Sequence, residues 1–199
     1  MSEIPIFPLQ TVLYPCGLLP LRIFEQRYVE MTKRCIAEDS VFGVCLILDG
    51  REAGAPAVPH AVGCTARIVD WDVPSPGLFN LRTRGETTFR IVERRIEPDG
   101  LIRAEVVLHE APPAPASPPE EHRALERLLS RIIDEIGAQH LPAPLQLDDP
   151  AWVCHRLAEL LDLPLAAKQR LLETADASAK AALLSSALRA MVSSARDTD

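Results

Sequence analysis

The sequence predicts an α+β fold in two parts, a β-rich part that forms a small barrel or a strongly curved sheet with one inserted helix, followed by a C-terminal four-helix bundle. Before residue 111, apolar residues alternate or form short runs, as in strands, and after residue 120 they recur at helical spacing. Between them lies the segment APPAPASPP, whose prolines fix φ and lack N–H donors. We therefore expect a β-rich unit over residues 1–111, a linker over 112–119 and a helical unit over 120–195.

The β-rich part contains several segments of strand length separated by turn residues. Residues 102–108 alternate most clearly, because Ile102, Ala104 and Val106 fall on one face. Gly and Pro turns such as 74–77 and 98–100 separate the segments and are typical of antiparallel connections. The expected strands are residues 41–48, 64–71, 78–84, 88–95 and 102–108.

One helix is expected to interrupt these strands. Four residues, Phe24, Tyr28, Met31 and Cys35, follow one another at helical spacing, and charged residues occupy the other faces. The pattern predicts an amphipathic helix whose aromatic stripe packs on the sheet.

The second part contains four apolar stripes at helical spacing. The first covers residues 125–136, and Gly137 can end it. Asp149 is suited to cap the next helix, with Pro150 at its first position, where a missing N–H costs nothing. Two further helices are expected, over residues 165–173 and from a cap at Asp176 onward.

Composition excludes several classes of function. The formal net charge of -7 opposes attraction to phosphate, so nucleic acid is not an expected partner. No apolar run reaches 18 residues, which argues against a membrane span. The five cysteines are widely spaced and form no C-x-x-C pair, so neither a disulfide framework nor a zinc site is expected. Unpaired cysteines among apolar neighbours fit a reducing compartment, and we expect the cytoplasm.

Four segments, in order, resemble the N-terminal substrate-recognition domain of Lon proteases. They are IPIFPLQTVLYPCGLLPLRIFEQRYVEM from Ile4, VGCTARIVDW from Val62, GETTFRIVE from Gly85 and LLDLPLAAKQRLLETAD from Leu160. The resemblance extends from Ile4 to about Met191. It implies a PUA-like β pseudo-barrel, a fold also represented by the Lon-like domain of cereblon.

The resemblance also implies a non-catalytic protein- or peptide-binding module. Its expected partners are unfolded or degron-bearing polypeptides and, in an adaptor role in protein quality control, a protease or chaperone. The sequence has no G-x-x-x-x-G-K-[ST] loop and ends at Asp199, so we expect no enzyme activity, no catalytic residue, no metal and no cofactor. The alternative is a PUA-like protein that binds RNA or a small molecule, since the fold alone does not determine the ligand.

The candidate peptide-binding residues lie at the entry of the first helix: Arg22, Phe24, Glu25, Arg27 and Tyr28. An arginine there offers a fork of donors to a peptide carbonyl or carboxylate. The alternative is that these side chains tie the helix to the barrel, and this structural role is favoured. Because Glu25 and Arg27 are too close in sequence to face each other along a helix, we expect them to reach different strands.

Other reactive or charged residues have structural interpretations that are favoured over functional ones. The pair Cys154-His155 could support thiol catalysis, but Cys154 adjoins an apolar stripe and is expected to be buried. Arginines concentrate on three expected strands, where interleaved glutamates and aspartates indicate cross-strand ion pairs rather than an RNA surface. The histidines expected at the surface are His60, His109, His122 and His140.

Overall fold

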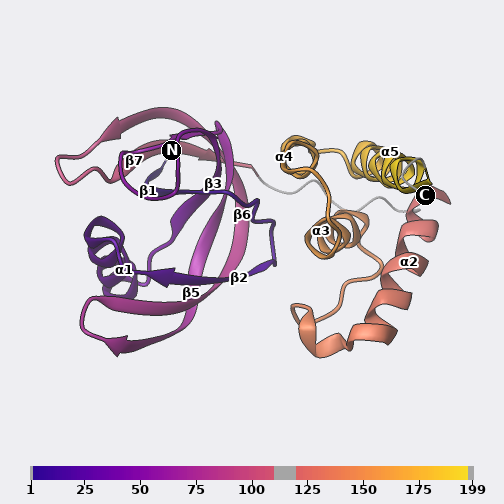
Figure 1. The fold of residues 1–199 in the computed structure, drawn as a ribbon, viewed down its shortest axis with the longest axis horizontal. Coiled ribbons are helices and arrows are strands. Elements are labelled where there is room, and N and C mark those ends of the chain that lie inside the picture. Colours follow the sequence, from indigo (N-terminus) through magenta and orange to yellow (C-terminus); the bar gives the residue numbers. More distant parts are fainter. Residues whose placement is uncertain (1, 110–119, 197–199) are drawn as a thin grey trace. The chain divides into compact units, whose positions relative to one another are not determined.

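The structure, a computed structural model, describes residues 2–109 and 120–196. Its backbone contacts divide the chain into two compact units, Met1–Glu110 and Ala111–Asp199 (Figure 1). The expected α+β class is confirmed, with a β barrel first and helices after it. The expected linker at residues 112–119 lies outside the described residues, so its boundaries stay a prediction.

Five strands of the first unit close into a barrel. They are β1 (Ser2–Leu9), β3 (Phe42–Asp49), β5 (Val62–Ser75), β6 (Leu78–Ile96) and β7 (Ile102–Leu108). The order β1-β7-β6-β5-β3 closes because β1 also pairs with β3, in parallel. Two short strands extend the sheet: β4 (Val58–Pro59) pairs with β3, and β2 (Leu18–Ile23) pairs with β6.

The strands expected at 78–84 and 88–95 are one continuous strand, so that prediction was wrong. Strand β6 does not turn at Gly85 but passes against the loop before β2, where the Cys16 N–H donates to the Gly85 carbonyl at 2.8 Å. In return, the Gly85 N–H donates to the Gly17 carbonyl at 2.8 Å. A Cβ at Gly85 would overlap the Tyr14 carbonyl oxygen. The glycine therefore marks a close approach of two backbones, not a break in the strand.

The inserted helix is α1 (Gln26–Glu38), between β2 and β3. Tyr28, Met31 and Cys35 are buried in the main barrel core, as their spacing predicted. Phe24 is an exception, because the backbone at Glu25 is extended and the helix begins only at Gln26. The Phe24 side chain is 66% exposed, so the prediction that it packs on the sheet was wrong.

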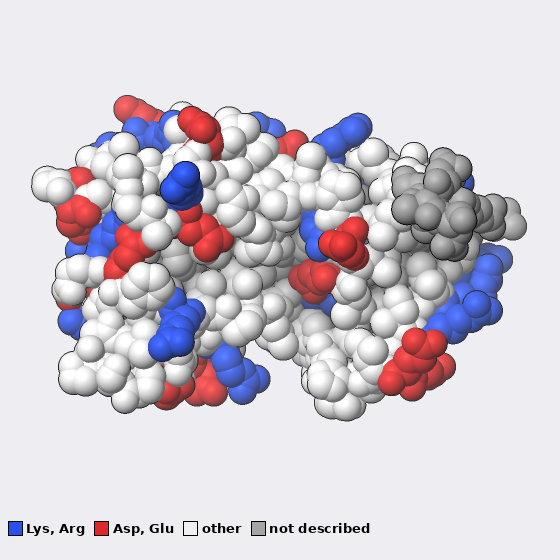
Figure 2. Space-filling view, viewed as in Figure 1, with Lys and Arg blue, Asp and Glu red and all other residues white. Residues whose placement is uncertain are grey.

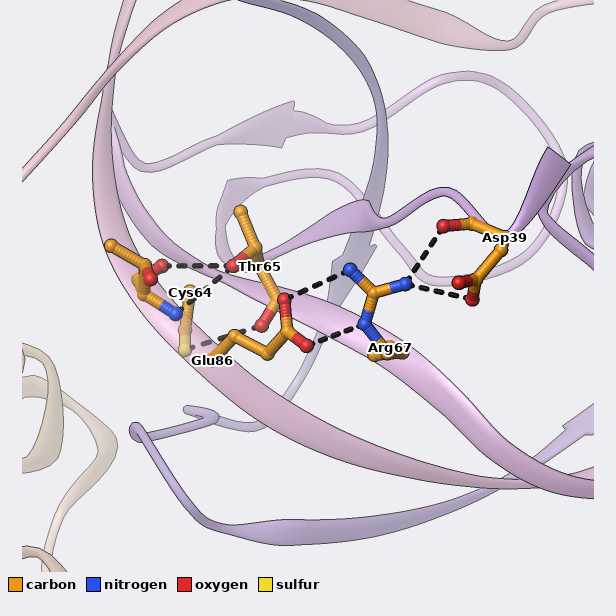
Figure 3. Close-up of polar contacts among 6 residues, drawn as sticks. Asp39, Cys64, Thr65, Arg67 and Glu86 are labelled. Carbon is orange, nitrogen blue, oxygen red and sulfur yellow. Dashed lines mark hydrogen bonds and ion pairs between the residues drawn. The ribbon is translucent and has the colours of Figure 1, made fainter.

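A polar network from β5 connects the end of α1 to the barrel (Figure 3). The Arg67 Nη1 donates to the Asp39 carbonyl at 2.7 Å, and the Arg67 Nε donates to Glu86 Oε1 at 2.5 Å. Next to it, the ladder between β5 and β6 has an irregularity at Thr65. There the Thr65 hydroxyl accepts from the Thr87 N–H at 3.0 Å and donates to the Thr87 carbonyl at 3.2 Å. The side chain thus replaces bonds that the irregularity removes from the ladder.

The second unit contains α2 (Glu120–Ile136), α3 (Pro150–Leu160), α4 (Leu165–Glu173) and α5 (Ala177–Arg196), with a short 3-10 helix at Ala138–His140. Helix α3 contacts the other three. The caps are confirmed: Asp149 Oδ1 accepts from the Ala151 N–H at 2.9 Å, and Asp176 Oδ2 accepts from the Ala179 N–H at 2.7 Å.

His122 is buried, so its expected surface position was wrong. No described helix is long and apolar enough to cross a membrane.

Candidate functional site

A shallow hollow lies where β5, β6 and β2 run side by side. Its volume is about 420 Å³. Two rows of directly paired residues cross it: Arg22, Asn80 and Asp72 form one, and Pro20, Arg82 and Asp70 form the other. Directly paired residues of neighbouring antiparallel strands face the same side. These rows give the hollow polar side chains, with Arg22 at its β2 side, and Leu21, Trp71 and Leu81 complete its lining.

Exposed apolar side chains gather at the same end of the sheet. Trp71 is 48% exposed, and its ring centroid lies 6.2 Å from that of Phe79. Phe79 pairs with Ile23, directly before the exposed Phe24. We call Phe24, Val69, Trp71 and Val73, all of them exposed, the rim patch. Large apolar groups left in water at one place favour contact with a partner.

Three of the five candidate residues tie α1 to the barrel. Arg27 is 6% exposed, and its Nη2 lies 2.8 Å from Glu25 Oε2. The expectation that these two side chains reach different strands was wrong, because Glu25 precedes the helix in extended conformation and can turn back. Arg27 Nη1 also donates to the Gly100 carbonyl at 3.3 Å.

Tyr28 lies beneath this ion pair. Its ring centroid is 4.1 Å from that of Phe7, and the Arg27 guanidinium lies 4.7 Å from the ring centre. Burial raises the pKa of Tyr28 to about 12, so the hydroxyl stays neutral. Arg22 and Phe24 are exposed and remain available to a ligand.

We expect Arg27→Ala to lower the free energy of unfolding by about 2 kcal/mol, because it removes a buried stem and leaves Glu25 and the Gly100 carbonyl without a cation. Arg22→Ala, on the exposed strand, should change it by less than about 0.5 kcal/mol. Urea denaturation of both variants measures the difference. Equal stability of the two variants would contradict the structural role of Arg27.

The pair Cys154-His155 lies in the core of the helical unit. Both side chains are buried, as expected for Cys154, and burial raises the pKa of the Cys154 thiol to about 12. His155 Nε2 lies 3.0 Å from Lys180 Nζ, and burial, with help from this cation, lowers the pKa of His155 well below its usual value. The thiol is therefore protonated and the imidazole neutral, which favours the structural interpretation.

Several of the strand arginines form the expected ion pairs. Arg95 pairs with Glu3, Arg103 Nε lies 2.8 Å from Glu97 Oε1, and Arg82 lies 3.5 Å from Asp70. On the face shown in Figure 2, basic and acidic side chains are interspersed over the barrel unit. Such mixing does not make the continuous positive surface that RNA phosphates need. Among residues 2–109 and 120–196, no His, Cys, Asp and Glu group is arranged to hold a metal ion.

A closed barrel with an inserted helix, followed by a helical unit, defines a class of fold and leaves the chemistry open. Residues 3–190 match the family of the ATP-dependent protease La (LON) substrate-binding domain. The chain belongs to this family, as the four resembling segments predicted.

Solved structures and curated relatives agree with this assignment. A Lon N-terminal domain protein from Xanthomonas campestris is 36% identical, with a TM-score of 0.78 over 94% of this chain and 98% of that one. The N-terminal domain of the Mycobacterium avium complex Lon protease is 18% identical, with a TM-score of 0.63 over 92% of this chain and 96% of that one, and shows the fold.

Two full-length proteins also match. Lon protease 2 of Myxococcus xanthus is 26% identical over 91% of this chain, and Lon protease of Anaeromyxobacter dehalogenans is 24% identical over 92%. The chain spans 23% and 22% of these two relatives. The similarity therefore concerns less than a quarter of each relative, and the activities of the whole proteins do not transfer with it.

Proposed function

We propose that this chain binds unfolded or degron-bearing polypeptide through the rim patch and the adjoining hollow, as an adaptor in cytoplasmic protein quality control. The observation that carries the proposal is the exposure of Phe24, directly after β2, and of Trp71 on β5, the two strands that flank β6 at this end of the barrel. Apolar side chains of an unfolded segment would be buried against these rings. Membership in a substrate-binding family supports the same conclusion.

The expected affinity is weak. Burial of a few side chains contributes about 25 cal/mol per Å² of apolar surface, and ordering a flexible ligand opposes it. Dissociation constants on the order of micromolar or weaker follow. Hydrophobic contacts are little affected by salt, so the affinity should change little between low and high ionic strength.

We expect Phe24→Ala to weaken binding of a labelled unfolded protein about tenfold, because one anchor of the rim patch is lost. The matched control is Ile96→Ala. Ile96 is 62% exposed, close to the value of Phe24, but lies at the opposite end of β6 from Phe79. Fluorescence anisotropy titrations of the wild type and both variants, at two salt concentrations, make the measurement.

Each outcome of this titration has a distinct meaning. Loss of affinity for Phe24→Ala alone supports the rim patch, and equal loss for Ile96→Ala would indicate a diffuse apolar attraction instead. Binding that disappears on addition of salt would point to an electrostatic partner such as RNA. Absence of binding by the wild type at every concentration would refute the proposed function. If the wild type does bind, a pull-down from cells identifies which protease or chaperone, if any, accompanies the chain.

A further inference from the structure

Strand β2 has one paired edge and one open edge. Within the described residues it pairs with β6 alone, in antiparallel register from Leu18 opposite Arg84 to Ile23 opposite Phe79. The neighbour of β6 on the other side is β5, so β2 ends the sheet here. An open strand edge presents a row of backbone donors and acceptors.

The phase of the hydrogen bonds shows which residues point outward. The Gly85 N–H donates to the Gly17 carbonyl and the Cys16 N–H donates to the Gly85 carbonyl, both at 2.8 Å, so a hydrogen-bonded bulge stands directly before the β2 ladder. The Leu19 carbonyl lies on the β6 side, because it accepts from the Thr83 hydroxyl at 2.8 Å. Hydrogen-bonded and non-bonded pairs alternate in an antiparallel ladder. The backbones of Leu19, Leu21 and Ile23 therefore bond to β6, whereas those of Leu18, Pro20 and Arg22 face away from it.

The position of Pro20 agrees with this phase. A proline has no N–H to donate, so it is tolerated in a strand where its nitrogen faces the open edge. The edge then offers the N–H groups of Leu18 and Arg22 and the carbonyls of Leu18, Pro20 and Arg22. Within residues 2–109 and 120–196, the structure gives none of these groups a hydrogen-bond partner.

The side chains beside this edge indicate which kind of strand fits. A strand added to β2 would extend the two rows that cross the hollow. In the first row, Asn80 Nδ2 donates to Asp72 at 3.1 Å, while Arg22 has no ion pair within the described residues. An acidic side chain placed opposite Arg22 would complete this row. The next two outward residues, Pro20 and Leu18, are apolar and suit apolar partners.

We propose that β2 receives an extended polypeptide segment as an additional strand, with an acidic residue opposite Arg22 and apolar residues opposite Pro20 and Leu18. This inference rests on the proposed function and specifies its ligand. The ligand is a segment in strand conformation with one acidic residue followed by two apolar residues, each at the second position after the one before. Main-chain hydrogen bonds supply affinity that is independent of sequence, and the side-chain rows supply preference.

A backbone substitution tests the proposal. Arg22→Pro removes the outward N–H but leaves the bonds of Leu21 and Ile23 to β6 in place, and Arg22→Ala removes the guanidinium but retains the N–H. With a labelled peptide of the pattern Glu-x-Leu-x-Leu, we expect binding at least tenfold weaker for Arg22→Pro and about threefold weaker for Arg22→Ala. Circular dichroism and urea denaturation check that both variants fold.

A second measurement uses the peptide itself. Methyl groups on the amide nitrogens of the Glu and Leu residues, which face β2 in this arrangement, should abolish binding, whereas methyl groups on the intervening amides should not. Hydrogen exchange at the amides of Leu18 and Arg22 should slow when the peptide binds, with no change at Leu19 and Leu21.

The outcomes separate this inference from the proposed function. If Arg22→Pro and Arg22→Ala both bind the peptide as tightly as the wild type does, the added strand is refuted. The rim patch then remains as the proposed binding surface. If the wild type binds neither peptide nor unfolded protein, the proposed function itself fails. If Arg22→Pro instead abolishes a dimer of the free chain in sedimentation experiments, the edge is occupied by a second copy and the proposal is overturned.

Discussion

Substitution of Gly85 by alanine is expected to lower the free energy of unfolding of the barrel by about 3 kcal/mol or more. The added methyl group would overlap the backbone carbonyl oxygen of Tyr14 and press on the Leu13 side chain. The loop cannot move away easily, because Cys16 and Gly17 are both hydrogen-bonded to Gly85. Overpacking against a fixed backbone costs more than displacement of a side chain.

The measurement separates the two units by their tryptophans. Trp71 lies in the barrel and Trp152 in the helical unit, so single-tryptophan versions report each unit during urea denaturation. Gly77→Ala is the control. Gly77 has a φ of 79° in the hairpin between β5 and β6, and a Cβ there meets nothing within 4 Å. Its cost, about 1 kcal/mol, comes from backbone conformation alone. Equal costs at the two positions would contradict the close approach at Gly85.

Gly85 also illustrates the limit of sequence reasoning about the fold. Local pattern predicted most elements well: residues 102–108 and 165–173 form the elements β7 and α4, and Asp149 caps α3. The same reasoning divided β6 into two strands, residues 78–84 and 88–95, and Gly85 fell in the gap between them. Its role depends on a loop far away in sequence, around Tyr14, which no local period reveals.

Prediction of the site was limited in a similar way. The family resemblance drew attention to the entry of α1, where Arg22 and Phe24 are exposed and Arg27 and Tyr28 are buried. Trp71 was not singled out. Its place across β6 from β2 arises from the pairing of β2, β6 and β5, and only the alternation of apolar and acidic residues after Ile68 could have indicated an exposed strand face.

The helical unit should depend strongly on Arg156, and Arg156→Ala is expected to lower its free energy of unfolding by about 3 kcal/mol. The side chain is 1% exposed, its Nη2 lies 2.8 Å from Glu159 Oε1, and its guanidinium lies 5.5 Å from the centre of the Trp152 ring. Truncation creates a cavity and removes the cation that is hydrogen-bonded to the Glu159 carboxylate, which leaves Lys168 as the other nearby cation. Arg156→Met, which keeps most of the volume, should cost less.

This cost should depend on pH. Burial raises the pKa of Glu159 to about 7, and Arg156 opposes the shift, so the variant should raise it further. An acid whose pKa is higher in the folded chain binds more protons there than in the unfolded chain, where its pKa is about 4.5. The folded variant therefore regains stability as pH falls from above 7 toward 4.5, and the difference from wild type should be smaller at pH 5 than at pH 8.

His155 also titrates as the pH falls. Burial lowers the pKa of His155, and the positive charges of Lys180 and Arg156 lower it further. A histidine with a lowered folded pKa loses stability as pH falls below about 6.5, and removal of Arg156 relieves part of that loss. Both groups thus reduce the cost of Arg156→Ala in acid. The contribution of the Glu159 carboxylate can be measured separately. The urea denaturation of the single-tryptophan version that retains Trp152, with and without Arg156→Ala, is repeated with Glu159→Gln present in both proteins. There the cost should vary less with pH, and an unchanged pH dependence would show that Glu159 is not its source.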